Sequence, residues 1–143
     1  MDVHCFTHNY DKKVTEIYTD VGVRWAFGDC KKFTEYKAVW DTGATITSIS
    51  EKIVGELGLQ PVGVKKVHYV NGTDYVPNYY VDIALPNKFI VPELIVVSGR
   101  CQEDDVLIGM DIINLGSFAI SNFNNKTTFS FMIPSTDKID FQT

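Results

Sequence analysis

The residues of this chain that most clearly suggest chemistry form the tetrapeptide Asp41-Thr42-Gly43-Ala44. It follows an apolar segment that ends in Ala38-Val39-Trp40 and precedes Thr45. A carboxylate held at the end of a strand can act as a general base on a water molecule. A glycine two residues later lets the backbone approach that carboxylate and a bound ligand closely. The pattern therefore indicates a functional site built around Asp41.

Two further segments follow this motif along the chain. Asn71-Gly72 is flanked by strand-forming residues, and both residue types tolerate the positive φ that a tight hairpin turn needs. Residues 106–113 read Val-Leu-Ile-Gly-Met-Asp-Ile-Ile, an apolar strand that meets a glycine and turns into a short helix. The chain thus offers an aspartate turn, then a hairpin over Lys66–Val76, then a strand-glycine-helix segment.

This order of features resembles the retropepsin family, the single-lobe aspartic proteases of retroviruses and their cellular and bacterial relatives. Ile108-Gly109-Met110-Asp111 is more similar to the Leu-Gly-Leu-Asp of cellular retropepsins than to the Gly-Arg-Asn of retroviral enzymes. The resemblance covers about residues 37–116. It implies an all-β fold, a closed β-barrel of the retropepsin type with one or two short helices.

The resemblance also implies a set of site residues for an aspartic endopeptidase. Asp41 would be catalytic. Asp111 would begin the helix after Gly109, where a carboxylate can accept hydrogen bonds from the free N–H groups at the helix start. The Thr42 hydroxyl would bond across a two-fold axis. The remaining implied residues are Thr42, Gly43, Ala44 and Thr45 in the active-site loop, Tyr69, Val70, Asn71, Gly72 and Thr73 in the flap, and Ile108 and Gly109 as loop supports. The resemblance implies no metal and no cofactor.

Aspartic proteolysis needs two carboxylates close enough to share one proton, because two like charges about 3 Å apart cannot both ionise. The chain holds a single Asp-[Ser/Thr]-Gly sequence. The chemistry therefore requires a C2 homodimer with Asp41 on both sides of the axis. The expected partners are a second copy of this chain and a peptide or protein substrate.

Some features depart from the retroviral pattern and leave alternatives open. The flap has fewer glycines, Met110 stands where retroviral enzymes have an arginine, and Thr45 stands where they have its acidic partner. One alternative is a catalytically inactive retropepsin-like module that binds peptide or only dimerises. Asp41–Thr47 also fits the phosphate loop of the actin and sugar-kinase fold, but that fold needs two large lobes.

Composition narrows the possible classes of protein. A chain of 143 residues predicts one domain over 1–143, with extra strands in 1–36 and 117–134 and a loose tail at 135–143. The net charge of -5, without a basic cluster, disfavours nucleic-acid binding. Cys5, Cys30 and Cys101 are too far apart for a zinc knuckle. No signal peptide or membrane-spanning run is evident, so we expect a cytoplasmic protein without membrane contact.

Turn residues recur every eight to twelve residues, as in an all-β domain. Ser50 is placed to cap a helix over Glu51–Leu57 that Gly58 would end, and Asp111–Leu115 could form another helix ended by Gly116. The expected strands are 14–18, 21–27, 33–40, 67–70, 74–85, 89–97, 117–121 and 127–133, with hairpin turns at 28–29, 71–72 and 86–87.

Overall fold

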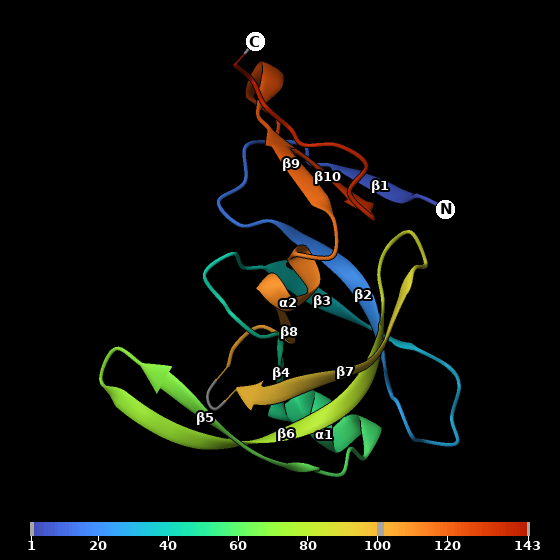
Figure 1. Ribbon diagram of the computed structural model, residues 1–143, viewed down its shortest axis with the longest axis vertical. Helices are drawn as coiled ribbons and strands as arrows, with labels where there is room; N and C mark the ends of the chain where they lie inside the picture. Colours follow the sequence, from blue (N-terminus) through green and yellow to red (C-terminus); the bar gives the residue numbers. More distant parts are fainter. Residues whose placement is uncertain (1, 100–101, 143) are drawn as a thin grey trace.

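A computed structural model describes residues 2–99 and 102–142 (Figure 1). Within these residues the chain is mostly strand, which confirms the expected all-β class. The strands are β1 (His4–Asn9), β2 (Tyr18–Trp25), β3 (Thr34–Trp40), β4 (Ser48–Ser50), β5 (Gly63–Tyr69), β6 (Gly72–Ala84), β7 (Ile90–Gly99), β8 (Val106–Ile108), β9 (Ser117–Ser121) and β10 (Thr128–Ile133). The helices are α1 (Glu51–Leu57), α2 (Met110–Ile113) and the 3₁₀-helix η1 (Phe123–Asn125).

The larger sheet has the strand order β2-β3-β8-β4-β7-β6-β5. β2 also pairs with β6, so the sheet bends back onto its own first strand. β3 and β8 are parallel, with Trp40 opposite Ile108. Because parallel strands end at the same edge of a sheet, the residues that follow them, Asp41 and Gly109, emerge side by side.

The smaller sheet has the order β1-β10-β9 and is antiparallel throughout. An aromatic cluster lies between this sheet and β3. The Trp40 ring centroid lies 5.0 Å from those of both Phe129 and Phe131, and 5.9 Å from that of Phe6. Burial of these large aromatic rings strongly stabilises the packing of the smaller sheet against β3, the strand that ends just before Asp41.

Helix α1 has the predicted bounds, and Gly58 ends it in the left-handed conformation with φ of 62°. Ser50 is the N-cap residue, as predicted, but its side chain makes no capping bond and its hydroxyl is buried without a partner. Helix α2 starts and ends earlier than predicted. It begins directly after Gly109, whose carbonyl accepts the N–H groups of Ile112 and Ile113.

Most predicted strands are present, and Ser117–Ser121 has the predicted bounds. The strand predicted over 14–18 is wrong, because β2 starts at Tyr18. The Val14 N–H instead donates to the Thr127 hydroxyl, which holds this segment as a loop against the start of β10. The strands β1 and β4 were not predicted. No helix in the described part of the chain has the length and apolar character needed to cross a bilayer.

Candidate active site

Asp41 lies in a tight turn directly after β3. Its N–H donates to the Ile108 carbonyl at 2.8 Å, and its own carbonyl accepts the Ala44 N–H at 3.1 Å. The Asp41 Oδ1 atom accepts the Gly43 N–H at 2.9 Å. A Cβ atom at Gly43 would lie only 3.2 Å from that oxygen. The turn therefore holds a partly exposed carboxylate through backbone groups of its own loop.

The strand-glycine-helix segment, residues 106–113, packs against this turn and holds it in place. The Met110 N–H donates to the Ala44 carbonyl at 2.8 Å. A Cβ atom at Gly109 would lie 2.8 Å from the Ala44 carbonyl oxygen and 2.8 Å from the Ile46 carbonyl carbon. Since these are backbone atoms, only glycine allows the two segments to lie this close. The structure thus brings together Asp41, Ala44, Ile108 and Gly109.

Asp111 is bound to the active-site loop through Thr47, which is fully buried. The Thr47 hydroxyl donates to Asp111 Oδ1 at 2.7 Å, and the Thr47 N–H donates to Asp111 Oδ2 at 2.9 Å. The Thr47 oxygen also accepts the Gly109 N–H at 3.1 Å. As expected of a carboxylate at a helix start, Asp111 accepts a nearby N–H, that of Ile112 at 2.9 Å.

Sequence reasoning missed Thr47. The only available signal was a hydroxyl residue shortly after the Asp41 motif. No periodicity links that residue to a carboxylate 64 positions later.

The loop separates two hollows. The larger hollow, of about 730 Å³, is lined by the loop residues Gly43, Ala44, Thr45 and Ile46 and by the β5–β6 hairpin. The smaller hollow, of about 500 Å³, is lined by Asp41 and Thr42 together with apolar side chains of β3, β9 and β10. The loop that carries the carboxylate therefore faces a groove on one side and a second recess on the other, to which Glu16 and Asp104 also contribute.

The β5–β6 hairpin forms one wall of the larger hollow and projects beyond the body of the molecule (Figure 1). Tyr69 pairs with Gly72, so Val70 and Asn71 form the tip. The turn predicted at Asn71-Gly72 is therefore displaced by one residue. Gly72 begins β6 with φ of 140°, a conformation that other residues rarely adopt. The side chain of Tyr69 lies outside the described residues.

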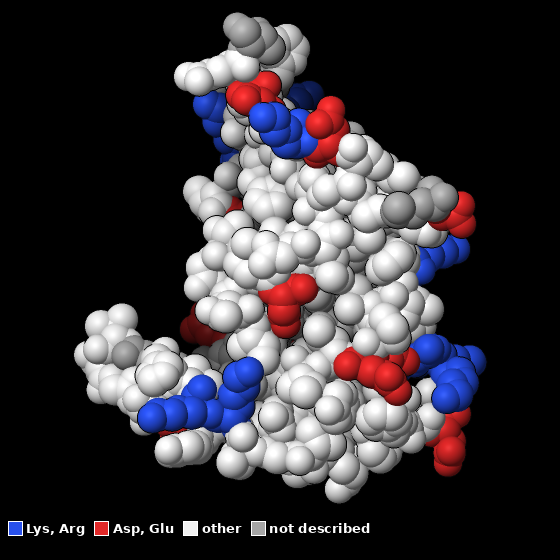
Figure 2. Space-filling view, viewed as in Figure 1, with Lys and Arg blue, Asp and Glu red and all other residues white. Residues whose placement is uncertain are grey.

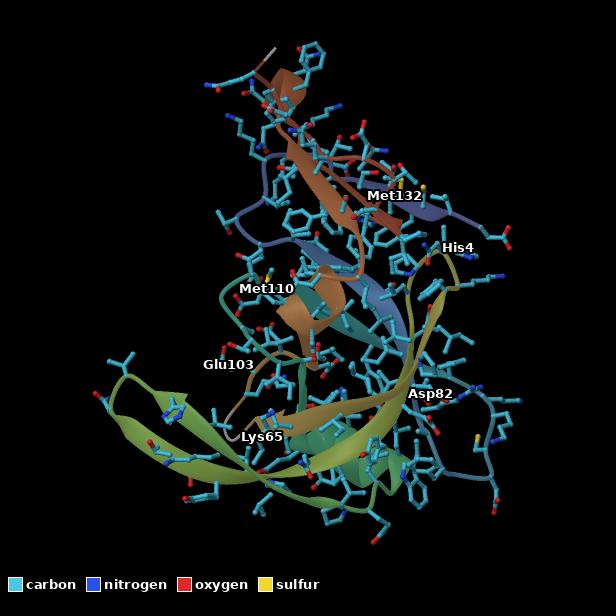
Figure 3. All side chains as sticks on the ribbon, viewed as in Figure 1. His4, Lys65, Asp82, Glu103, Met110 and Met132 are labelled. Atoms are coloured by element: carbon cyan, nitrogen blue, oxygen red, sulfur yellow. The ribbon has the colours of Figure 1, made fainter. Side chains whose placement is uncertain are left out.

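Charged side chains of the hairpin also reach this hollow. Lys65, Lys66 and His68 line it from β5, while Glu103 and Asp104 line it from the segment before β8. Figure 2 shows basic side chains gathered over the hairpin, and Figure 3 shows Lys65 and Glu103. The Thr73 hydroxyl lies 3.3 Å from His68 Nδ1 on the exposed part of the hairpin. A ligand in the groove would thus meet both signs of charge.

Residues 32–114 match the family described as gag-polyprotein putative aspartyl protease. This chain belongs to that aspartyl protease family. Its fold is similar to that of a retropepsin-like aspartic protease from Rickettsia conorii, with a TM-score of 0.62 and 14% identity over 92% of this chain and 96% of the other.

A second solved structure with this fold is the EIAV protease complexed with the inhibitor HBY-793. It has a TM-score of 0.53 and 16% identity over 69% of this chain and 86% of the other. No curated protein sequence matches this chain. The family match and these folds confirm the retropepsin resemblance.

Within the described ranges, no group of three or more His, Cys, Asp and Glu side chains is arranged to hold a metal ion. Cys5 and Cys30 are free thiols at the surface, and Cys101 lies outside the described residues. The site described above consists of a carboxylate, backbone N–H groups and hydroxyls.

Proposed function

We propose that this chain is an aspartic endopeptidase, with Asp41 as its catalytic residue and a second copy supplying the other aspartate. The supporting observation is the position of Asp41. It lies in a glycine-bearing turn held by Ile108, in a loop with a groove on one side and a smaller recess on the other. Membership of the aspartyl protease family supports the same reaction class.

In this proposal the two Asp41 carboxylates share one proton and titrate as a pair. The ionised carboxylate removes a proton from a water molecule, which attacks the carbonyl carbon of the scissile peptide bond. The protonated carboxylate donates a hydrogen bond to the carbonyl oxygen. The roles then reverse, and a proton is delivered to the leaving amine as the C–N bond breaks.

The proposed roles of the surrounding residues follow from their positions. Thr42 is exposed beside Asp41, so its hydroxyl is free to bond with the corresponding loop of the second copy. The substrate backbone would lie in the larger hollow along Gly43, Ala44 and Thr45. The hairpin tip at Val70 and Asn71 would close over it, with Tyr69, Gly72 and Thr73 on either side. Ile108, Gly109 and Asp111 would keep the loop in place.

The test is cleavage of a peptide library by the purified chain and by the variant Asp41→Asn. We expect the wild-type chain to cleave peptides and the variant to lose cleavage while keeping its circular dichroism spectrum and its oligomeric state. The matched control is Asp20→Asn, which changes an exposed aspartate on β2 and should cleave like the wild type. Binding of peptides without cleavage by the wild-type dimer would instead identify an inactive peptide-binding module.

A further inference from the structure

We infer that the larger hollow selects peptides in which an acidic side chain stands next to a basic one. Lys65 and Lys66 of the β5–β6 hairpin bind the acidic side chain, and Glu103 and Asp104 of the segment before β8 bind the basic one. This inference rests on the proposed function, because it names the class of substrate that the same site cleaves. Four features of the structure support it.

The first feature is that the two walls of the hollow carry charges of opposite sign. Lys65 and Lys66 line it from β5, whereas Glu103 and Asp104 line it from the segment that precedes β8. Figure 3 labels Lys65 and Glu103, one residue from each wall. A charged group of a ligand is attracted to one wall and repelled by the other. The charges of a bound peptide therefore determine how it lies in the hollow.

The second feature is that the charges of these walls are not engaged in ion pairs with each other or with other described side chains. The ion pairs within residues 2–99 and 102–142 lie elsewhere, between Arg24 and Asp82 and between Lys52 and Asp105. Lys65, Lys66 and Glu103 are exposed to solvent. A peptide that enters the hollow therefore meets charged groups that are free to form new ion pairs.

The third feature is that hydrogen bonds attach the acidic wall to the body of the molecule. The Gln102 amide nitrogen donates to the Asp104 carbonyl at 2.8 Å, and Gln102 Oε1 accepts the Ser48 hydroxyl at 2.7 Å. The Ser50 N–H donates to the Asp105 carbonyl at 2.9 Å. The lysines instead lie on a hairpin that projects from the body (Figure 1). Closure of this hairpin over a peptide would bring the lysines toward an acidic wall that is already in place.

The fourth feature is the apolar surface that the hollow also contains. Val67, Val76, Val97 and Leu107 contribute to its lining. Charges attract each other more strongly beside apolar groups than in bulk water, because the effective dielectric constant is lower there. An extended peptide points successive side chains to opposite sides of its backbone. A peptide that lies between the two walls would therefore direct one side chain to the lysines and the next to the acidic residues.

The first experiment measures cleavage of a peptide library in which two neighbouring positions are fixed and the others vary. The fixed pair is Glu-Lys or Lys-Glu, the uncharged pair Gln-norleucine in either order, Glu-Glu or Lys-Lys. In one of the two orders, the oppositely charged pair should raise kcat/KM roughly threefold to tenfold over the uncharged pair. Pairs of like charge should give no such gain, because one wall repels them. The preference should shrink between 0.1 M and 1 M salt, as the Debye length falls from about 10 Å to about 3 Å.

The second experiment reverses the charge of one wall. The double variant Lys65→Glu, Lys66→Glu should lose the preference for Glu-Lys and cleave Lys-Lys peptides better instead, because both walls are then acidic. The matched control is Lys31→Glu, Lys32→Glu, which reverses two adjacent exposed lysines in the loop between β2 and β3. The control makes the same change in net charge, and neither of its residues lines a hollow described above. It should keep the wild-type preference.

Binding of the same peptides, labelled with a fluorophore, to the Asp41→Asn variant separates this inference from the proposed function. If the wild type cleaves all pairs equally, or if the hairpin variant keeps the preference for Glu-Lys, the charge selection is wrong and the protease stands. If the wild type cleaves nothing but Asp41→Asn binds Glu-Lys peptides more tightly than uncharged ones, the selection stands and the proposed protease activity is wrong. Absence of both cleavage and charge-dependent binding overturns both.

Discussion

At the residue scale, the position of Asp41 depends on Gly109 having no side chain. The loop carbonyls of Ala44 and Ile46 lie where a Cβ atom at this position would be. The carboxylate itself receives only a loop N–H among the bonds described above. The geometry of the candidate site is therefore set mainly by backbone contacts between two segments distant in sequence.

Gly109→Ala should displace the active-site loop, because its Cβ atom would lie 2.8 Å from backbone atoms that cannot rotate away. We expect a loss of roughly 1–3 kcal/mol in unfolding free energy from overpacking, and a loss of cleavage larger than the stability change explains. Urea denaturation and peptide cleavage measure the two effects. Gly55→Ala is the control, since a Cβ atom there has nothing within 4 Å, and it should stabilise α1 by about 0.5–1 kcal/mol.

Thr47→Val keeps the shape of the side chain but removes the hydroxyl that joins Asp111 to the loop. The buried Gly109 N–H would then lose its hydrogen-bond acceptor, and the Asp111 carboxylate would lose a hydrogen-bond donor. We expect a loss of about 1–3 kcal/mol in unfolding free energy by denaturant titration. Thr47→Ser, which keeps the hydroxyl, should recover most of it. Equal stability of the Val and Ser variants would show that the hydroxyl contributes nothing.

The sequence predicted which residues form the candidate site better than it predicted the hydrogen bonds between them. The Asp41–Ala44 motif and Gly109 were recognisable because a turn and a strand-glycine-helix junction have local signatures. The Thr47 to Asp111 bond joins two segments that are distant in sequence and that the pairing of β4 with β8 brings together. Ser50 shows the opposite error, since a suitable cap residue is buried without making the capping bond.

At the element scale, α1 is joined to the larger sheet by a tyrosine. The Tyr36 hydroxyl on β3 donates to Glu56 Oε1 at 2.8 Å. Burial raises the pKa of Tyr36 above its ordinary value of 10.0, and the hydrogen bond to Glu56 raises it further. In the unfolded chain this hydroxyl ionises near pH 10, whereas in the folded chain it stays protonated. Its contribution to stability is thus present below pH 10 and is lost as the pH rises above it.

Tyr36→Phe should therefore flatten the loss of stability at alkaline pH. We expect the slope of unfolding free energy against pH above 10 to be smaller by about 1.4 kcal/mol per pH unit. At neutral pH the variant should lose about 1 kcal/mol with the hydrogen bond. Denaturant titrations between pH 7 and 11 measure both quantities. Tyr75→Phe, at a mostly exposed ring, is the control, and an equal flattening there would contradict the assignment to Tyr36.

The helices and strands were predicted correctly where neighbouring residues in the sequence determine them. Gly58 ends α1 where expected because glycine readily adopts the left-handed conformation that ends the helix there. The segment 14–18 was predicted as a strand from its residue types, but tertiary contacts hold most of it as a loop. β4 is too short to show a pattern, and it exists because β7 and β8 pair with it on both sides.

At the scale of the whole molecule, the sequence could not assign strands to sheets. The pairing of β1 with β10 joins the two ends of the chain, and the parallel pairing of β3 with β8 joins Trp40 to Ile108. Neither contact leaves a local signature, because each depends on how the intervening strands are ordered. The sequence shows directly, in contrast, that the chain has a single Asp-[Ser/Thr]-Gly motif, and this predicts that two chains form one active site.

A mixing experiment tests that state of assembly. If each active site needs two Asp41 residues, exchange of wild-type and Asp41→Asn subunits in equal amounts should leave about one quarter of the cleavage activity, since random pairing makes only that fraction of dimers wild type on both sides. Activity is measured at constant total protein after subunit exchange. A residual activity of one half would mean that each chain acts independently.

The two hollows beside Asp41 offer two routes to inhibition. A compound in the larger hollow would compete with substrate, and raising the substrate concentration would relieve it. A compound in the smaller hollow, which Thr42 also lines, would instead compete with the second chain of the proposed dimer, and raising the protein concentration would relieve this inhibition. Because Asp41 lines the smaller hollow directly, a ligand bound there would contact the proposed catalytic carboxylate without resembling a peptide.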